Sequence, residues 1–144
     1  MAVISRQAVV AYSCEQMYAL VSDIAAYDSF LTWCTKSEVH SDDGTRVRAT
    51  LHLKYKGVGL SFTTINRNTP PHSLVMTLEE GPFKRLEGEW VFKPLGDDGC
   101  KVGFELNFDF SSAVYAGLFK PVLQRAASSL VDAFVERAQK TYGR

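Results

Sequence analysis

The sequence has no excess charge of either sign, since 16 lysine and arginine residues balance 16 aspartate and glutamate residues. A balanced chain has no broad attraction for phosphate groups, so DNA is not an expected partner. The 144 residues contain no run of about 18 apolar residues, which a membrane-spanning helix would need. The first residues also lack the basic and apolar segments of a signal peptide, and we therefore expect a cytoplasmic protein.

Potential metal ligands are few and scattered. No two histidines stand at the spacing of zinc ligands on one element, and no cysteine lies close enough in the sequence to complete such a site. The odd number and wide separation of the cysteines also argue against a disulfide framework and fit a reducing compartment: Cys14, Cys34 and Cys100. We therefore expect neither a metal nor another cofactor.

Enzyme signatures are missing as well. The sequence has no G-x-S-x-G segment and no glycine-rich phosphate loop. Cys34 has no identified base, and a single such cysteine is more often a small buried apolar residue than a nucleophile. We therefore expect a protein without catalytic activity. A cyclase reaction stays open as a minority alternative, because a shaped cavity would need only a few polar groups for it.

Strict alternation of apolar and polar residues is the clearest positive signal. Between Thr45 and Tyr55 one parity is apolar and the other polar or charged, which predicts a strand with one buried and one solvated face. The pattern recurs around residues 58–62, 74–78, 86–92 and 102–110. With a first strand over Ala2–Val10 and another from Trp33 onward, the sequence predicts seven antiparallel strands.

Helical periodicity occurs near the two ends of the chain. Ser13 and Gln16 have capping-box spacing and predict a helix over Cys14–Asp23, followed by a short turn over Tyr27–Leu31. An apolar stripe near the end predicts a helix over Pro121–Lys140, about 30 Å long and able to cross the sheet. Pro121 would be its first residue or a kink, because proline does not fit a helix interior.

These elements predict a single α+β domain over residues 1–144, with a curved antiparallel sheet wrapped around the long C-terminal helix. One helix does not densely fill the inside of such a sheet, and unfilled apolar volume is costly. The layout therefore favours an apolar cavity that binds a hydrophobic molecule. A filled core is the alternative, because alternating apolar strands are ordinary in sheet cores.

Several segments resemble the helix-grip fold of START-like (SRPBCC) domains, in the coenzyme Q-binding and polyketide-cyclase-like branch that includes the ribosome-association toxins. The likeness covers essentially the whole chain. Its most specific part is EGPFKRLEGEWVFKPL at residues 80–95, supported by YDSFLTWC at 27–34, Ile4-Ser5-Arg6, and Tyr12-Ser13 leading into residues 15–18. Prolines usual in the family are replaced here by Asp28 and Thr32.

The resemblance implies two main functions. Some relatives bind ubiquinone and support respiration, while toxins of the RatA kind bind the large ribosomal subunit and block its joining with the small one. Ubiquinone or another isoprenoid lipid is therefore the expected ligand, and the ribosome the alternative partner. The expected ligand-binding residues are Phe30, Leu31, Trp33, Leu51, Phe62, Met76, Leu78, Phe83, Trp90, Phe104, Phe108, Leu118, Leu123, Ala127, Leu130 and Phe134.

A cluster of basic residues is the candidate contact for RNA. Arg46, Arg48, Lys54 and Lys56 fall on the solvated side of one predicted hairpin, and exposed basic side chains suffice for phosphate contacts. An ordinary solvated face is the favoured explanation of these residues, and an RNA contact is the alternative. Glu87, Glu89, Glu105 and Asp109 on other strands would break up such a patch, and no aromatic stacking platform accompanies it.

Overall fold

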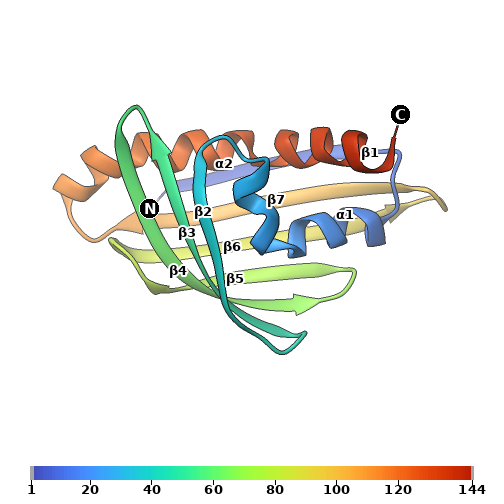
Figure 1. Ribbon diagram of the computed structural model, residues 1–144, viewed down its shortest axis with the longest axis horizontal. Helices are drawn as coiled ribbons and strands as arrows, with labels where there is room; N and C mark the ends of the chain where they lie inside the picture. Colours follow the sequence, from blue (N-terminus) through green and yellow to red (C-terminus); the bar gives the residue numbers. More distant parts are fainter. Residues whose placement is uncertain (1, 144) are drawn as a thin grey trace.

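The computed structural model describes residues 2–143 and shows a seven-stranded antiparallel sheet crossed by one long helix (Figure 1). The strands lie in the order β1-β7-β6-β5-β4-β3-β2 across the sheet. The predicted fold class is confirmed. The strands are β1 (Ala2–Val10), β2 (Cys34–Asp42), β3 (Arg46–Tyr55), β4 (Val58–Thr69), β5 (Ser73–Glu80), β6 (Phe83–Leu95) and β7 (Gly99–Phe110).

Two short helices follow β1 and cover one end of the sheet. Helix α1 (Cys14–Ser22) begins with the predicted capping box, in which the Ser13 hydroxyl accepts a hydrogen bond from the Gln16 amide at 3.1 Å. The 3-10 helix η1 (Ile24–Ser29) starts earlier and ends earlier than the predicted turn over Tyr27–Leu31. Helix α1 packs against α2, β6 and β7, so it closes this end of the interior.

The long helix α2 (Ala113–Tyr142) begins well before the predicted start. Ser112 caps it by accepting a hydrogen bond from the Tyr115 amide at 3.0 Å. At 1.5 Å per residue its 30 residues span about 45 Å. Pro121 lies inside the helix, so it is not the first helical residue, and of the two predicted alternatives only that of a kink stays a prediction.

The C-terminal end of α2 is held by two tyrosines. The Tyr12 hydroxyl donates a hydrogen bond to the Gly143 carbonyl, and the Tyr142 hydroxyl donates to the Gln16 carbonyl, both at 2.8 Å. Along its length α2 contacts β1 and β7 at one side of the sheet and β3 and β4 at the other. The sheet therefore curls around the helix, as Figure 1 shows.

The predicted inward parity is confirmed on the long strands. On β7 every second side chain from Cys100 to Phe110 is buried, while Lys101 and Glu105 are exposed. On β6 the buried set runs through Leu86, Gly88, Trp90 and Phe92. These side chains face α2 and form one continuous apolar core.

Candidate functional site

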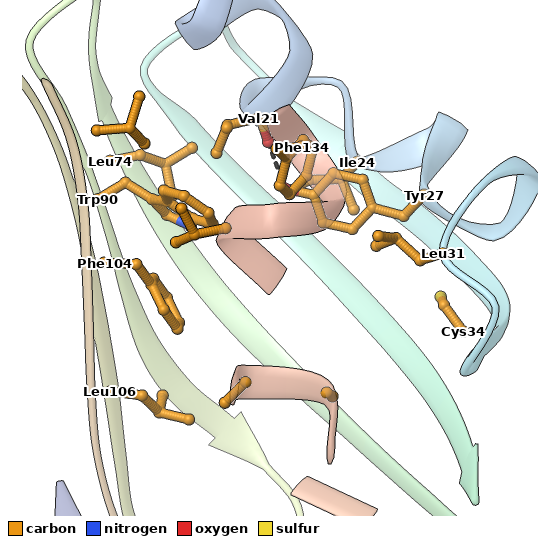
Figure 2. Packing of buried hydrophobic residues seen from close by; sticks show 14 of the residues in the cluster. Val21, Ile24, Tyr27, Leu31, Cys34, Leu74, Trp90, Phe104, Leu106 and Phe134 are labelled. Atoms are coloured by element: carbon orange, nitrogen blue, oxygen red, sulfur yellow. Dashed lines mark hydrogen bonds between the residues drawn. The ribbon is translucent and has the colours of Figure 1, made fainter. Parts of the chain in front are cut away.

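An apolar cavity lies between the inner face of the sheet and the middle of α2. Figure 2 shows Trp90, Phe104 and Leu106 extending from the sheet toward this space. Side chains from η1, from five strands, from α2 and from the segment before β2 contribute to its wall. The lining residues are Tyr27, Trp33, Leu51, Leu53, Phe62, Thr64, Met76, Leu86, Gly88, Trp90, Phe104, Leu106, Leu123, Ala126, Ala127 and Leu130.

Small residues on facing elements create the space. Gly88 on β6 contributes no side chain to the wall, and Ala126 and Ala127 on α2 contribute only methyl groups. A methyl group at Gly88 would collide with the terminal methyl group of Met76 on the neighbouring strand. Met76 therefore occupies room that the glycine leaves, and its flexible thioether chain can adopt other rotamers.

The cavity volume is about 60 Å³. An engineered cavity of about 150 Å³ in another protein holds one benzene molecule, so this space is too small for a quinone ring. The interior thus lies between the two expectations from the sequence: a cavity is present, but side chains fill most of the gap. Leu51, Met76 and Leu130 in its wall are only partly buried, so the wall reaches solvent at these side chains.

The polar groups of the wall are bonded to the protein itself. The Thr64 hydroxyl donates to the Asn66 side-chain oxygen at 2.8 Å, and the Trp33 indole N–H donates to Ser129 Oγ at 3.1 Å. The Tyr27 hydroxyl donates to the backbone carbonyl of Val21. Burial raises the pKa of the Tyr27 phenol far above its ordinary value, so this group is neutral. The wall therefore offers a guest mainly hydrocarbon contacts.

One side of the cavity is closed by an aromatic group that we call the Phe134 cluster: Tyr27, Phe30, Trp90 and Phe134. The Phe134 ring lies 5.3 Å from Tyr27, 5.4 Å from Phe30 and 5.4 Å from Trp90, in edge-to-face arrangements. Its side chain is 0% exposed. The Arg137 guanidinium covers the outer side of Phe30 at 4.8 Å. Packed edge-to-face rings stabilise one another beyond their burial.

A second aromatic group, the tip cluster, consists of Phe62, Phe83, Phe110 and Phe119. Phe62 in the cavity wall lies 5.8 Å from Phe83, which stacks on Phe110 at 4.7 Å. Phe110 lies 6.4 Å from Phe119 on α2, and Phe119 lies 5.8 Å from Tyr115. These rings form a continuous series from the cavity wall to the first turns of α2.

The structure brings more than half of the predicted ligand-binding residues into the cavity wall. Contact of these side chains with a ligand stays a prediction. The predicted residues that line the cavity are Trp33, Leu51, Phe62, Met76, Trp90, Phe104, Leu123, Ala127 and Leu130.

Three other predicted residues lie at the closed side, outside the wall. Phe134 is shielded from the cavity by the rings around it. Phe30 and Leu31 line a separate groove on the outer side of α2, next to charged side chains such as Arg137. The segment from η1 to β2 turns these two residues away from the cavity, which the sequence pattern alone did not indicate.

The last four predicted residues also lie outside the wall. Phe83 belongs to the tip cluster, and Phe108 is buried with its ring 5.8 Å from Phe110. Leu78 is half-buried beside the turn at Gly81. Leu118 is 48% exposed, because the first turns of α2 extend past the core.

Sequence reasoning missed several lining residues. Alternation along the strands had already placed Leu53, Leu86 and Leu106 on the inner face, and helical spacing had placed Ala126 on the inner stripe. Thr64 lies on the same parity of β4 as Leu60 and Phe62, and it was missed because the predicted ligand-binding set contained only apolar side chains. The lining residues that were not predicted to bind the ligand are Tyr27, Leu53, Thr64, Leu86, Gly88, Leu106 and Ala126.

The described residues offer little machinery for catalysis. Within residues 2–143 no three His, Cys, Asp or Glu side chains are grouped so that they could hold a metal ion. Cys34 is buried, and this burial raises the pKa of its thiol to about 11, so the thiol is protonated and weakly nucleophilic at neutral pH. Cys14 and Cys100 form a buried thiol pair with their sulfur atoms 2.8 Å apart.

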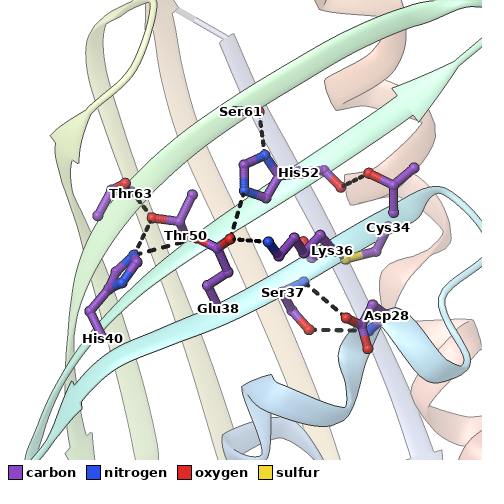
Figure 3. A network of polar contacts seen from close by, with 11 residues as sticks. Asp28, Cys34, Lys36, Ser37, Glu38, His40, Thr50, His52, Ser61 and Thr63 are labelled. Atoms are coloured by element: carbon purple, nitrogen blue, oxygen red, sulfur yellow. Dashed lines mark hydrogen bonds and ion pairs between the residues drawn. The ribbon is translucent and has the colours of Figure 1, made fainter.

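The outer face of β2 to β4 carries a polar network (Figure 3). Glu38 binds the Lys36 ammonium group at 2.8 Å, and this contact lowers the pKa of the Glu38 carboxyl. His52 and His40 stand 3.7 Å and 3.9 Å from the same carboxylate. His52 also bonds Ser61 at 2.7 Å. The Glu38 carboxylate is thus the common neighbour of Lys36, His40 and His52 on this face.

The predicted RNA-contact residues lie on this outer face of β3 and in the turn after it. They are Arg46, Arg48, Lys54 and Lys56. Arg48 binds Glu79 at 2.6 Å, and the Asp43 carboxylate accepts a hydrogen bond from the Arg46 amide at 2.7 Å. One basic side chain of the four, Arg48, is therefore already paired with an acidic group, and contact of this face with RNA stays a prediction.

Across residues 2–143, no helix combines the length and apolar character needed to cross a lipid bilayer.

Comparison with known proteins identifies the family. A family model described as polyketide cyclase / dehydrase and lipid transport matches residues 10–135. The chain is 40% identical to the ribosome association toxin RatA of Vibrio cholerae over 140 residues, which cover 97% of each chain. It is 30% identical to the mitochondrial coenzyme Q-binding protein COQ10 homolog B of Xenopus laevis, over 97% of this chain and 59% of that protein.

Solved structures agree with this assignment. An 18 kDa protein from Caulobacter crescentus is 32% identical, with a TM-score of 0.78 and complete coverage of both chains. The Zhui aromatase/cyclase from a Streptomyces species has a TM-score of 0.86 over 98% of this chain and 95% of that one. Its sequence is only 15% identical, so the comparison shows the shared fold alone. From its sequence and its fold, the chain belongs to the polyketide cyclase/dehydrase and lipid transport family.

Proposed function

We propose that the protein binds a hydrophobic small molecule, an isoprenoid quinone or similar lipid, between the sheet and α2, and that it does so without catalysis. The hydrocarbon wall carries this proposal, because its polar groups already have protein partners. Such a wall holds a guest through apolar contact, worth roughly 0.8 kcal/mol for each buried CH₂ group. The relative named as a coenzyme Q-binding protein supports the same ligand class.

A quinone would enter only after the wall rearranges, because the cavity volume is about 60 Å³. Met76 is the side chain best suited to move, since it is partly exposed and fills the space beside Gly88. An isoprenoid tail is narrow and flexible, and it could follow the line of small residues along α2. The proposal therefore requires that side-chain rotamers change on binding while the sheet and α2 keep their positions.

Ligand extraction and cavity filling test the proposal together. Organic extracts of protein purified from respiring cells should contain an isoprenoid quinone by mass spectrometry. Quinone added to the purified protein should quench the fluorescence of Trp33 and Trp90 in the wall. Ala127→Leu fills the cavity and should weaken this quinone binding at least about tenfold, at a cost of about 1–3 kcal/mol in stability.

Gln124→Leu is the matched control, because Gln124 is exposed one turn earlier on the same helix. This variant should bind quinone like the unmodified protein. Lipid-free extracts combined with unchanged quinone binding by Ala127→Leu would refute the proposed site.

A second candidate function is action on ribosomes, which is favoured by the 40% identity to the toxin RatA across nearly the whole of both chains. Overproduction of the protein should then raise free ribosomal subunits at the expense of whole ribosomes in sucrose gradients. Lys54→Glu with Lys56→Glu should reduce the effect if the outer face of β3 makes the contact. Unchanged ratios of subunits to whole ribosomes on overproduction would refute this function.

A further inference from the structure

The first two turns of α2 expose an apolar surface that the core does not use. Val114 is 75% exposed, Tyr115 44% and Leu118 48%. In Figure 1 this end of α2 extends beyond the edge of the sheet, at the far end of the helix from the C-terminus. Three large apolar side chains within five consecutive residues of one helix form a coherent surface rather than single exposed residues.

The composition of this segment is unusual for an exposed helix. Between Ser111 and Pro121 the only charged residue is Lys120. At 3.6 residues per turn, Val114, Leu118 and Pro121 fall on one side of the helix. Ala116 and Phe119 point the other way, where they pack against the core. The exposed side is therefore apolar along its whole length.

Other exposed apolar side chains do not form such a surface. Val9 on β1 lies opposite Lys101, and Val91 on β6 lies opposite Gly103. Val3 on β1 and Leu95 on β6 are also exposed on these outer faces, but polar side chains separate them from Val9 and Val91. Single exposed valines of this kind need no functional explanation. The surface at Val114, Tyr115 and Leu118 differs because it is continuous.

The tip cluster connects this surface to the cavity. Tyr115 contacts Phe119, and the rings then follow one another through Phe110 and Phe83 to Phe62 in the cavity wall. The Ser111 amide and hydroxyl both donate hydrogen bonds to the Pro82 carbonyl, at 3.0 and 3.2 Å. These bonds hold the β7–α2 turn against the β5–β6 turn. An apolar path thus runs from the exposed helix surface toward the cavity.

Basic residues stand next to this apolar path. Lys84 follows Phe83 at the start of β6, and Lys120 follows Phe119 on α2. Neither forms an ion pair among the described residues 2–143. Both lysines are exposed, whereas the neighbouring Arg85 is bound to Glu87 at 3.3 Å. Lysines beside an exposed apolar helix suit anionic lipid headgroups.

We propose that the first two turns of α2 dock on an anionic lipid bilayer, with Val114, Tyr115 and Leu118 entering the headgroup region and Lys84 and Lys120 meeting lipid phosphates. A tyrosine at the edge of the patch fits this placement, because its ring is apolar and its hydroxyl stays hydrated. This inference rests on the proposed function for its purpose, since docking would bring the cavity next to the membrane that holds an isoprenoid ligand.

Vesicle binding tests the docking without any quinone. The protein should sediment with quinone-free vesicles of phosphatidylethanolamine and phosphatidylglycerol, and much less with phosphatidylcholine alone. Leu118→Glu should lower the partition coefficient at least about tenfold, because it would place a charge instead of a leucine side chain in the headgroup region. Val9→Glu is the matched control, because Val9 is 70% exposed outside this surface, and it should sediment normally.

Two further readouts make the result decisive. Tyr115→Trp should show a blue-shifted emission on adding the anionic vesicles, whereas Val9→Trp should not. Leu118→Glu should still load quinone supplied in detergent, so failed docking and failed ligand binding are told apart. Vesicle binding that is absent in the unmodified protein, or unchanged in Leu118→Glu, would overturn the proposal. The unmodified protein could instead fail to bind vesicles but associate with itself or with ribosomes. If Leu118→Glu abolishes that association, the surface belongs to that partner and the membrane proposal is overturned.

Discussion

The two aromatic clusters beside the cavity differ in how they are enclosed. The Phe134 cluster is gathered around one fully buried ring and is sealed by η1 and by Arg137. The tip cluster is a linear series of rings that runs from Phe62 to Phe119 and continues to the exposed Tyr115. One side of the interior therefore fixes the fold, whereas the other side connects the interior with the surface.

Truncation of Phe134 should have the largest effect. Phe134→Ala removes the central ring of a fully buried cluster, and we expect a loss of about 3–5 kcal/mol in the free energy of unfolding. Urea denaturation monitored by circular dichroism measures this loss. Phe134→Leu is the conservative control and should lose clearly less. A loss below about 1 kcal/mol for Phe134→Ala would show that this side does not secure the fold.

Truncation of Phe119 should cost less, because this ring is only partly buried at the surface end of the tip cluster. We expect Phe119→Ala to lower the free energy of unfolding by about 1–2 kcal/mol, roughly half the value for a fully buried ring. The same urea titrations give the comparison directly. An equal loss in Phe134→Ala and Phe119→Ala would remove the distinction between the two clusters.

Alkaline pH should lower the free energy of unfolding, because Cys34 and Tyr27 are buried acidic groups at the side of the cavity that the Phe134 cluster closes. Burial raises the pKa of the Cys34 thiol to about 11 and also raises the pKa of the Tyr27 phenol. Between pH 9 and 11 the unfolded thiol loses its proton while the folded one keeps it, so stability falls as pH rises through this window. We expect a decrease of up to about 1 kcal/mol from Cys34 between pH 8 and pH 10.

Urea titrations at the two pH values measure this decrease. Cys34→Ala should lose less stability over the same range, because it has no thiol to ionise. A pH dependence identical to that of the unmodified protein would contradict the assignment to Cys34.

Much of the fold was predictable because local chemistry determines it. Alternation along Arg46–Tyr55 and Gly99–Phe110 identified the strands and their inner faces, and Ser13 with Gln16 identified the start of α1. The start of α2 was placed too late because Pro121 looked like a boundary. A proline inside a helix is tolerated when packing on either side holds the helix together, and sequence pattern does not report that packing.

The candidate site was less predictable. Parity placed Trp90 and Phe104 on the inner face, but it does not say how far each side chain reaches, so the small volume of the cavity was not foreseen. Leu118 was predicted to bind the ligand, but it lies outside the cavity wall. Its exposure depends on where α2 leaves the sheet, which is a property of the tertiary arrangement.

Pro121 marks the point where α2 passes from its exposed turns to its buried length, since Lys120 and Pro121 are exposed and Val122 is 1% exposed. Proline has no amide hydrogen, so the Gly117 carbonyl one turn earlier lacks its usual helical donor. Gly117 adds no side chain to stiffen this turn, and the space beside it is open. The backbone hydrogen bonding of α2 is therefore interrupted at this turn, and Pro121 lies two residues before Leu123, where the cavity wall begins. Bending of α2 at this turn would tilt the exposed first turns while the wall and the tyrosine-anchored far end stay in place.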